Sequence, residues 1–356
     1  MKVEDVMRCN FTSWYKTFED VTIRSIALPI PPEFLDYLHA DTVVLPEGSH
    51  QGAYSSATAE DSEEDEETVD WNSSTDCREA TMPDCKGFLA EVDAAIALLG
   101  GKVFPKLNWS SPQDASWVSL NNSLQCCHAS DVCLLLKSSD FVTRDLTQPF
   151  VHCEDGEVGS RDVVLKHELV LRQWKDINTS HEFRCFVKDG KLIGICPRNH
   201  SKFLKHIMDT RGEIQADIEQ FFEEVVDGDF IEEGGCYTFD VWRKKKNEVK
   251  LVDFNPFGPV TDALLFDWEE LTASDLSETL VFRCVESESG VQPHSLAHFG
   301  VPKDFVDLAT GNDPFKLMDL IKLGQIQGQG DASSDDDDDV NDGGKDQTSA
   351  NGVTDR

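Results

Sequence analysis

Residues 236–257 read CYTFDVWRKKKNEVKLVDFNPF and contain two alternating segments around a short polar turn, the pattern of a β-hairpin. In the second segment, Val249 and Leu251 share one strand face with Asp253 and Asn255. Aspartate and asparagine are poor strand formers, and a half-buried carboxylate is costly unless a cation meets it. The hairpin therefore predicts a sheet with a cation site at one end.

The pairing of this hairpin follows from its turn. If the two-residue turn is Lys246–Asn247, Asp240 lies opposite Asp253 and Thr238 lies opposite Asn255. Opposed side chains have Cβ atoms ~4.5–5.5 Å apart, so two carboxylates there destabilise the sheet unless a divalent cation joins them. A longer turn would shift this pairing.

Three oxygen-bearing side chains thus converge on one face, and we predict that they bind Mg²⁺: Asp240, Asp253 and Asn255. One or two carboxylates together with substrate phosphates are the usual Mg²⁺ arrangement. The alternative is that Asp240 pairs with a lysine or arginine and that Asp253 caps a turn.

The phosphates of a nucleotide need cations, which we expect on other strands. Lys106 lies in VFPKLNW, Arg172 in ELVLRQW and Arg184 in EFRCF. Lysine binds phosphate as a point charge and arginine as a fork. Trp109 and Trp174 are candidates to flank a base, although each of these five residues, taken singly, is more often a surface or core residue.

Several other classes of protein are disfavoured. Neither GxxxxGK[ST] nor GxGxxG is present, and a protein kinase would also need an HRD catalytic loop and a VAIK lysine. The 11 cysteines have no zinc-ligand spacing, and their odd number without a secretory signal favours reduced thiols in the cytosol or nucleus. The sequence contains no run of 18 apolar residues, so we expect no membrane span.

The net charge is −35, of which two acidic stretches, 60–70 and 331–346, carry −15 and the rest of the chain carries −20. Such a surface repels phosphates, so direct nucleic-acid binding is not expected. An acidic interaction protein of the histone-chaperone type remains an alternative. We divide the chain into an ordered N-terminal segment (1–45), an acidic flexible linker (46–84), a main body (85–325) and a disordered acidic tail (326–356).

The main body alternates helical and strand patterns. Helices are expected at 88–99, near 130–139, at 213–226 and near 313–323, and strands at 102–109, at 167–174 and in a hairpin that turns at Asp189–Gly190. Strands that pair through hairpins outnumber crossover helices. We therefore expect an α+β protein with antiparallel or mixed sheets.

Several long blocks closely resemble the cell division cycle protein 123 family, assembly factors for eukaryotic translation initiation factor 2. The blocks are VFPKLNWSSP, LLLKSSDFVTRDLTQPF, ELVLRQW, EFRCFVKDGKLIGICPR, FDVW and LVDFNPFG. The resemblance extends in order over residues 1–325. It implies a two-lobed fold of the ATP-grasp type that holds ATP and Mg²⁺ between its sheets.

The resemblance also implies roles for individual residues. Lys106 matches a phosphate-binding lysine, Val170 a hinge-strand residue whose main chain meets the adenine, and Arg184 and Arg198 positions that face the nucleotide. The full set of expected nucleotide-binding residues is Lys106, Asn108, Trp109, Ser111, Val170, Arg172, Trp174, Glu182, Arg184 and Arg198. The expected metal donors are again Asp240, Asp253 and Asn255.

The function that the resemblance implies is that of a chaperone, and whether ATP is also turned over stays open. We expect the protein to be cytoplasmic and monomeric. It would bind the gamma subunit of translation initiation factor 2 and promote assembly of that factor, and hence translation initiation and cell-cycle progression. The alternative is an ATP-grasp carboxylate–amine ligase that acts on a peptide or small carboxylate. No motif identifies an acyl acceptor site.

Overall fold

The computed structural model describes residues 1–40, 46, 84–119, 122–156, 163–231, 234–273, 279–287 and 299. All of them belong to one compact unit, Met1–Gly300. The predicted linker, apart from its two described ends Pro46 and Asp84, lies outside this part of the chain, as do the predicted tail and the helix expected near 313–323.

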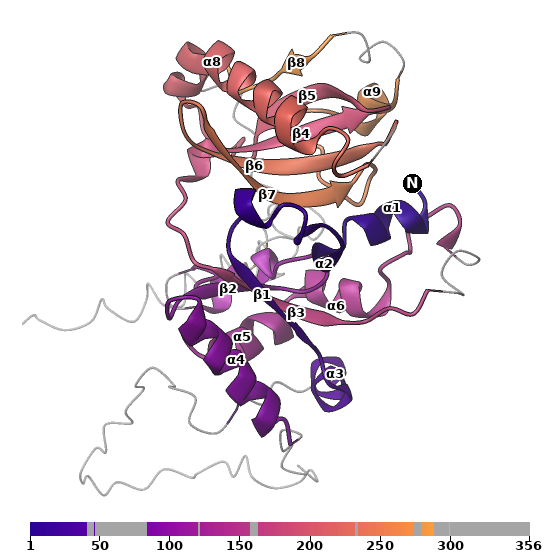
Figure 1. Ribbon diagram of the computed structural model, residues 1–356, viewed down its shortest axis with the longest axis vertical. Coiled ribbons are helices and arrows are strands. Elements are labelled where there is room, and N and C mark those ends of the chain that lie inside the picture. Colours follow the sequence, from indigo (N-terminus) through magenta and orange to yellow (C-terminus); the bar gives the residue numbers. More distant parts are fainter. Residues whose placement is uncertain are drawn as a thin grey trace, which may run out of the picture. The chain divides into compact units, whose positions relative to one another are not determined.

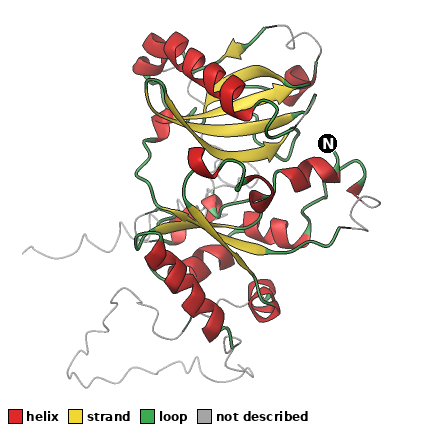
Figure 2. Ribbon diagram, viewed as in Figure 1, coloured by secondary structure: helices red, strands yellow, loops and turns green. Residues whose placement is uncertain are grey.

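The small lobe is built on a three-stranded antiparallel sheet of order β1-β3-β2 (Figures 1 and 2). Its strands are β1 (Ser25–Pro29), β2 (Val103–Lys106) and β3 (Glu168–Gln173). Its helices are α3 (Pro32–His39), α4 (Lys86–Leu98), α5 (Ala129–Lys137) and α6 (Asp140–Thr147).

Alternation along β3 assigns the two faces of this sheet. Leu169 and Leu171 are fully buried against apolar residues of α4 such as Val92 and Ile96. Val170 and Arg172 point the opposite way, because successive strand residues face opposite sides. This second face of the small lobe is the one that turns towards the large lobe.

The large lobe is built on a five-stranded sheet of order β7-β6-β4-β5-β8. Its strands are β4 (Glu182–Lys188), β5 (Lys191–Pro197), β6 (Tyr237–Lys245), β7 (Glu248–Pro256) and β8 (Val281–Phe282). Only the β5–β8 pair is parallel among the described strands. The two-lobed α+β fold with antiparallel and mixed sheets is therefore confirmed.

Helices cover both faces of the large sheet (Figure 1). Helix α8 (Lys205–Phe221), which continues as a π-helical turn at Phe222–Val226, packs Ile214 and Ile218 on the face that includes Phe183. On the other face, the short helix α9 (Trp268–Thr272) helps to bury the aromatic pair of Phe186 and Phe266.

The N-terminal segment contributes to both lobes. After the short helices α1 (Val3–Arg8) and α2 (Phe11–Trp14), the chain forms β1 of the small sheet. The rings of Trp14 and Phe18 nevertheless each lie 5.3 Å from the ring of Phe254 in the core of the large lobe. None of the described helices has the length and apolar character needed to cross a bilayer.

The turns and the pairing of the hairpins agree with the sequence. Asp189 and Gly190 connect β4 to β5 with φ angles of 49° and 75°. Asn247, at φ 59°, closes the turn between β6 and β7. Asp240 pairs with Asp253 and Thr238 with Asn255, as predicted.

A β-bulge beside the aspartates corrects one expectation. After the Asp240–Asp253 pair, the next pair is Val241–Leu251, so Val252 is an extra residue on β7. Such a residue interrupts the alternation of faces. Leu251 therefore lies in the same core cluster as Phe254, and the prediction that it shares a face with Asp253 is wrong.

Candidate nucleotide site

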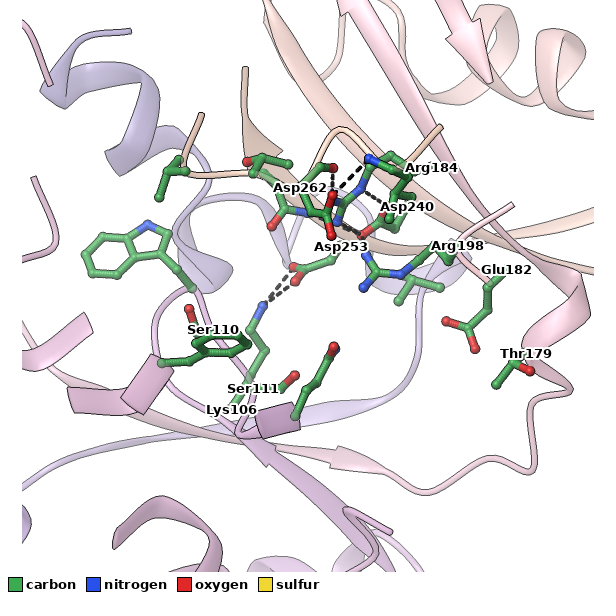
Figure 3. A pocket seen from close by; sticks show the side chains of 18 of the residues that line it. Lys106, Ser110, Ser111, Thr179, Glu182, Arg184, Arg198, Asp240, Asp253 and Asp262 are labelled. Carbon is green, nitrogen blue, oxygen red and sulfur yellow. Dashed lines mark hydrogen bonds and ion pairs between the residues drawn. The ribbon is translucent and has the colours of Figure 1, made fainter. Parts of the chain in front are cut away.

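A cavity of about 440 Å³ lies between the two lobes (Figure 3). The small lobe contributes Phe104, Lys106, Trp109, Ser111, Arg144 and Arg172 to its walls, and the large lobe contributes Glu182, Arg184, Arg198, Asp240, Asp253 and Asn255. All three expected metal donors and most of the expected nucleotide-binding residues are thus brought to one place. The volume is within the range of roughly 300–1,000 Å³ that small-molecule sites occupy.

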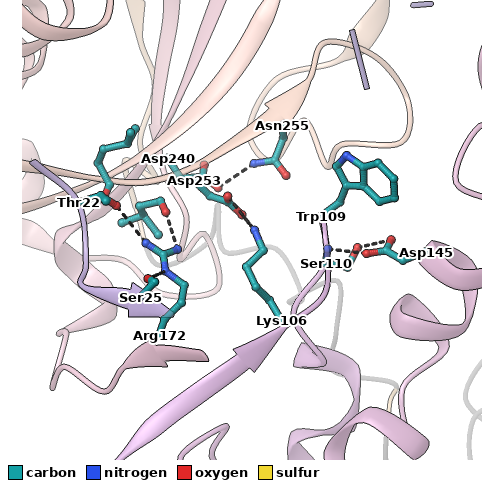
Figure 4. A network of polar contacts seen from close by, with 12 residues as sticks. Thr22, Ser25, Lys106, Trp109, Ser110, Asp145, Arg172, Asp240, Asp253 and Asn255 are labelled. Carbon is teal, nitrogen blue, oxygen red and sulfur yellow. Dashed lines mark hydrogen bonds and ion pairs between the residues drawn. The ribbon is translucent and has the colours of Figure 1, made fainter. Parts of the chain in front are cut away.

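Lys106 of the small lobe and Asp253 of the large lobe form an ion pair in the wall of the cavity. The Lys106 Nζ atom lies 2.8 Å and 2.6 Å from the two carboxylate oxygens of Asp253 (Figures 3 and 4). Lys106 is 1% exposed, whereas the Asp253 side chain is 18% exposed. Burial lowers the pKa of Lys106, and the attraction of Asp253 opposes this effect. The pair joins the end of β2 to β7.

Asp240 lies under two arginines. Arg184 donates from Nε to Oδ1 and from Nη2 to Oδ2, both at 2.8 Å, and Arg198 donates to Oδ2 as well. The Asn255 amide nitrogen lies 3.3 Å from the same Oδ2. Burial would raise the pKa of Asp240, but the two guanidinium groups outweigh it and hold the pKa below its usual value.

Both aspartates therefore have cationic partners in this structure. Asp240 pairs with arginines, which agrees with the alternative interpretation of that residue, and its side chain is only 3% exposed. Asp253 pairs with Lys106 and does not cap a turn through its side chain.

Arg172 joins the lobes. Its Nε donates to the Ser25 hydroxyl at 3.3 Å, its Nη1 to the Val252 carbonyl at 2.6 Å and its Nη2 to the Thr22 hydroxyl at 3.1 Å (Figure 4). The guanidinium also lies 5.5 Å from the centre of the Phe104 ring. Burial lowers the pKa of Arg172 to about 10. The predicted phosphate ligand thus lines the cavity but spends most of its donors on holding β1 to β7.

Glu182 begins β4 and lines the cavity without a hydrogen-bond partner for its carboxylate among the described residues. Burial raises its pKa, and the neighbouring Arg198 opposes that shift. A carboxylate of this kind favours hydroxyl or amino groups as ligands, because they can donate hydrogen bonds to it.

Hydrogen bonds from Ser110 and Trp109 hold the loop after β2 in place, and the sequence had singled out only Trp109 among the residues that form them. The Asp145 carboxylate on α6 accepts hydrogen bonds from Ser110 N at 2.7 Å and from Ser110 Oγ at 2.9 Å (Figure 4). Trp109 Nε1 donates to the Val6 carbonyl at 2.8 Å. The signal for α6 was the block SSDFVTRD, which stood out in the resemblance but carried no predicted role.

Three expected ligands do not reach the cavity. Asn108 is 1% exposed, and its side chain bonds to the Lys166 carbonyl and the Glu168 amide, so it supports the loop. Trp174 is not among the lining residues and stacks edge-on to Phe104 at 6.5 Å.

Val170 lies in the central strand of the small sheet, between Ala27 and Lys106. Its main-chain groups are enclosed by neighbouring strands and Val170 does not line the cavity, so the adenine contact through them stays a prediction.

The donor set fits a magnesium–phosphate ligand better than a metal held by protein alone. The described residues contain no cluster of three or more His, Cys, Asp or Glu side chains that could hold a metal ion. Mg²⁺ takes one or two carboxylates and completes its shell with phosphates and water. Asp253 and Asn255 are the accessible oxygen donors, and Lys106 is the adjacent cation.

The comparisons with known proteins agree with this architecture. The chain matches the D123 family over residues 14–309. A Xenopus laevis protein named "Translation initiation factor eIF2 assembly protein" is 43% identical over 334 residues, which is 91% of this chain and 97% of that protein. A Danio rerio protein of the same name is 42% identical and covers 91% and 94% of the two chains.

Among solved structures, Cdc123 from Schizosaccharomyces pombe superimposes with a TM-score of 0.65 at 32% identity, over 81% of this chain and 99% of that one. The blocks that form the cavity walls lie inside the matched region. The chain belongs to the D123 family.

Proposed function

We propose that this protein is an assembly chaperone for translation initiation factor eIF2 that binds ATP with Mg²⁺ in the cavity between its lobes. The names of the D123 relatives support the assembly role. The observation that carries the nucleotide site is the pairing of Lys106 with Asp253 across the cavity, beside Asp240 with its two arginines.

These residues can exchange their present partners for a bound nucleotide. Asp253 would hold the metal of Mg²⁺–ATP, which would supply the positive charge that Asp253 now receives from Lys106, and Lys106 would then contact a phosphate. Asn255 adds a neutral oxygen on the same face. Asp240 has both oxygens engaged, so its main role is to hold Arg184 and Arg198 towards the phosphates.

The partner in this proposal is the gamma subunit of eIF2, and the protein acts on it in the cytoplasm as a monomer. Bound nucleotide would fix the distance between the lobes and so keep one surface ready for the partner. Translation initiation and cell-cycle progression would then depend on this assembly step.

The nucleotide site is tested by ligand-induced thermal stabilisation. A ligand present at 100 times its dissociation constant adds about 2.7 kcal/mol to the free energy of unfolding if it binds only the folded state. We expect Mg²⁺–ATP to raise the melting temperature of the wild type and of Asp229→Ala, an exposed control. Asp253→Ala should lose most of the shift, whatever its own melting temperature. An unchanged shift in Asp253→Ala would refute the assignment.

The assembly role needs a separate measurement. Purified gamma subunit should bind the wild type in a pull-down, and Mg²⁺–ATP should strengthen that binding in the wild type but not in Asp253→Ala. If a resin without the gamma subunit recovers as much of the wild-type protein as a resin that carries it, the proposal is contradicted. Release of ADP that depends on a carboxylate or amine acceptor would favour the ligase alternative.

A further inference from the structure

A small side chamber of about 60 Å³ opens from the metal-donor end of the main cavity. The two spaces share Trp109, Ser110, Arg144, Asn255, Val260 and Thr261 as lining residues. The far end of the chamber is bounded by Gln148, Val151 and His152, all of which are exposed. The chamber therefore connects the outer surface to the neighbourhood of Asn255.

Arg144 on α6 is the notable group in its wall. The other Lys and Arg side chains that line the main cavity all donate to a protein oxygen: Lys106, Arg172, Arg184 and Arg198. Among the described residues, no oxygen accepts a hydrogen bond from the half-buried guanidinium of Arg144. The guanidinium carbon of Arg144 lies 5.4 Å from the centre of the Phe141 ring.

Asp145, the neighbouring acid, forms no ion pair or hydrogen bond with Arg144, although the two charges interact at longer range. Both oxygens of Asp145 accept hydrogen bonds from Ser110, and adjacent helix residues point in different directions. A half-buried guanidinium retains five N–H donors in a planar fork, which matches the two oxygens of a carboxylate. Because Asp145 lies next to it, a singly charged anion is favoured over a doubly charged phosphate.

From this cavity and its unpaired cation, we infer that the side chamber binds a carboxylate through Arg144. The chamber of about 60 Å³ is large enough to admit a carboxylate group. The carboxylate can belong to a small free acid or to a peptide that enters past Gln148 and His152. This inference goes beyond the proposed nucleotide binding, since it requires no nucleotide.

The test uses the full chain labelled with ¹⁵N at arginine, with the Arg144 Nε–Hε signal assigned from its loss in Arg144→Gln. N-acetylglycine should shift that signal saturably, whereas its neutral amide should not. Arg144→Lys should weaken binding about ten-fold or more, because lysine lacks the fork. Arg211→Gln, an exposed arginine on α8, should bind as the wild type does.

Two further arms identify the source of the carboxylate. One peptide has a free C-terminal glycine, and its binding would indicate that the site takes a chain terminus. The second is the same peptide with both ends blocked and an internal glutamate, and its binding would indicate that the site takes an acidic side chain. Binding of the free acid alone would indicate a small-molecule ligand. Gln148→Trp, which narrows the outer mouth, should weaken whichever ligand binds while the Arg144 signal remains visible.

Three outcomes would overturn the inference. The first is the absence of a saturable shift with every acid, and the second is an equal shift with acid and amide. The third is a loss of Mg²⁺–ATP stabilisation in Arg144→Gln without any carboxylate binding, since it would assign Arg144 to the nucleotide. Failure of ATP to bind the wild type, together with acid binding, would refute the proposed function and leave this inference standing.

Discussion

Glu182 and Asp240 are two cavity acids whose pKa values move in opposite directions for identifiable reasons. Both are desolvated, which raises the pKa of a carboxyl group. Asp240 receives charge-assisted hydrogen bonds from Arg184 and Arg198 that more than offset this effect. Glu182 receives none, so burial raises its pKa despite the nearby charge of Arg198.

A pH prediction follows for Glu182. Its pKa is raised in the folded protein above the ordinary value of 4.5, so the folded state holds the proton longer than the unfolded state does. Stability therefore falls as the pH rises from the ordinary pKa through the raised one. In Glu182→Gln this group no longer titrates, so the loss disappears. The difference in free energy of unfolding, variant minus wild type, should therefore increase as the pH rises from 4.5 through the raised pKa.

Urea unfolding between about pH 2.5 and about pH 8 measures this difference. Glu248→Gln is the control, since hydrogen bonds from Lys244 and Lys245 lower the pKa of Glu248. Its stability relative to the wild type should decrease as the pH rises through the region below 4.5. A Glu182→Gln difference that does not vary with pH would contradict the assignment.

At the scale of elements, the hairpin explains what the sequence could predict. The turn at Lys246–Asn247 sets the first pair, Lys245–Glu248. The register then shifts between Arg243 and Lys245 and shifts back between Asp240 and Val241, so Asp240 still lies opposite Asp253 as predicted. The bulge at Val252 could not be seen, because an extra residue leaves no mark in the composition of a strand. The error in placing Leu251 follows from it.

The other features that the sequence did not reveal concern how elements dock. Val170 was expected to expose its main chain, but β1, from a distant part of the chain, covers that edge of β3. Arg144 was missed because its importance depends on where α6 packs. The periodicity of apolar residues predicts which face of a helix or strand is buried. Tertiary contacts decide which other element packs against that face.

The packing of β5 yields a prediction for two glycines. A Cβ atom on Gly194 would lie 3.0 Å from Phe266 Cζ and 3.3 Å from Phe186 Cδ2. Those rings are packed edge to face, so Gly194→Ala should cost about 1–3 kcal/mol of unfolding free energy. Gly212→Ala on α8 meets no atom within 4 Å and should gain about 0.5–1 kcal/mol. Chemical denaturation distinguishes them, and a stabilised Gly194→Ala protein would contradict the packing.

At the scale of the whole molecule, Arg172 couples the small lobe to the large one. It binds Thr22 and Ser25 before and in β1, and the Val252 carbonyl in β7. Arg172→Lys keeps the charge but cannot reach all three acceptors. Since a hydrogen bond to a charged group contributes about 1.5–3 kcal/mol, we expect a loss of at least this size.

Hydrogen exchange tests whether that loss uncouples the lobes. In Arg172→Lys, the amides of β1–β3 should exchange faster than those of β4–β7, whereas the wild-type lobes should open together. Arg243→Lys is the matched control, because Arg243 pairs with Asp217 within the large lobe. Equal acceleration of both lobes in Arg172→Lys would show that other contacts couple them.

The packing of Trp14 and Phe18 against Phe254 has a consequence for synthesis of the chain on the ribosome. These aromatic side chains emerge early, yet their partner strand is made more than 200 residues later. At about 5–20 residues per second, the delay is on the order of 10–50 s. During that time the first aromatic residues remain unburied by their final neighbours, and a nascent-chain chaperone that shields them would prevent aggregation.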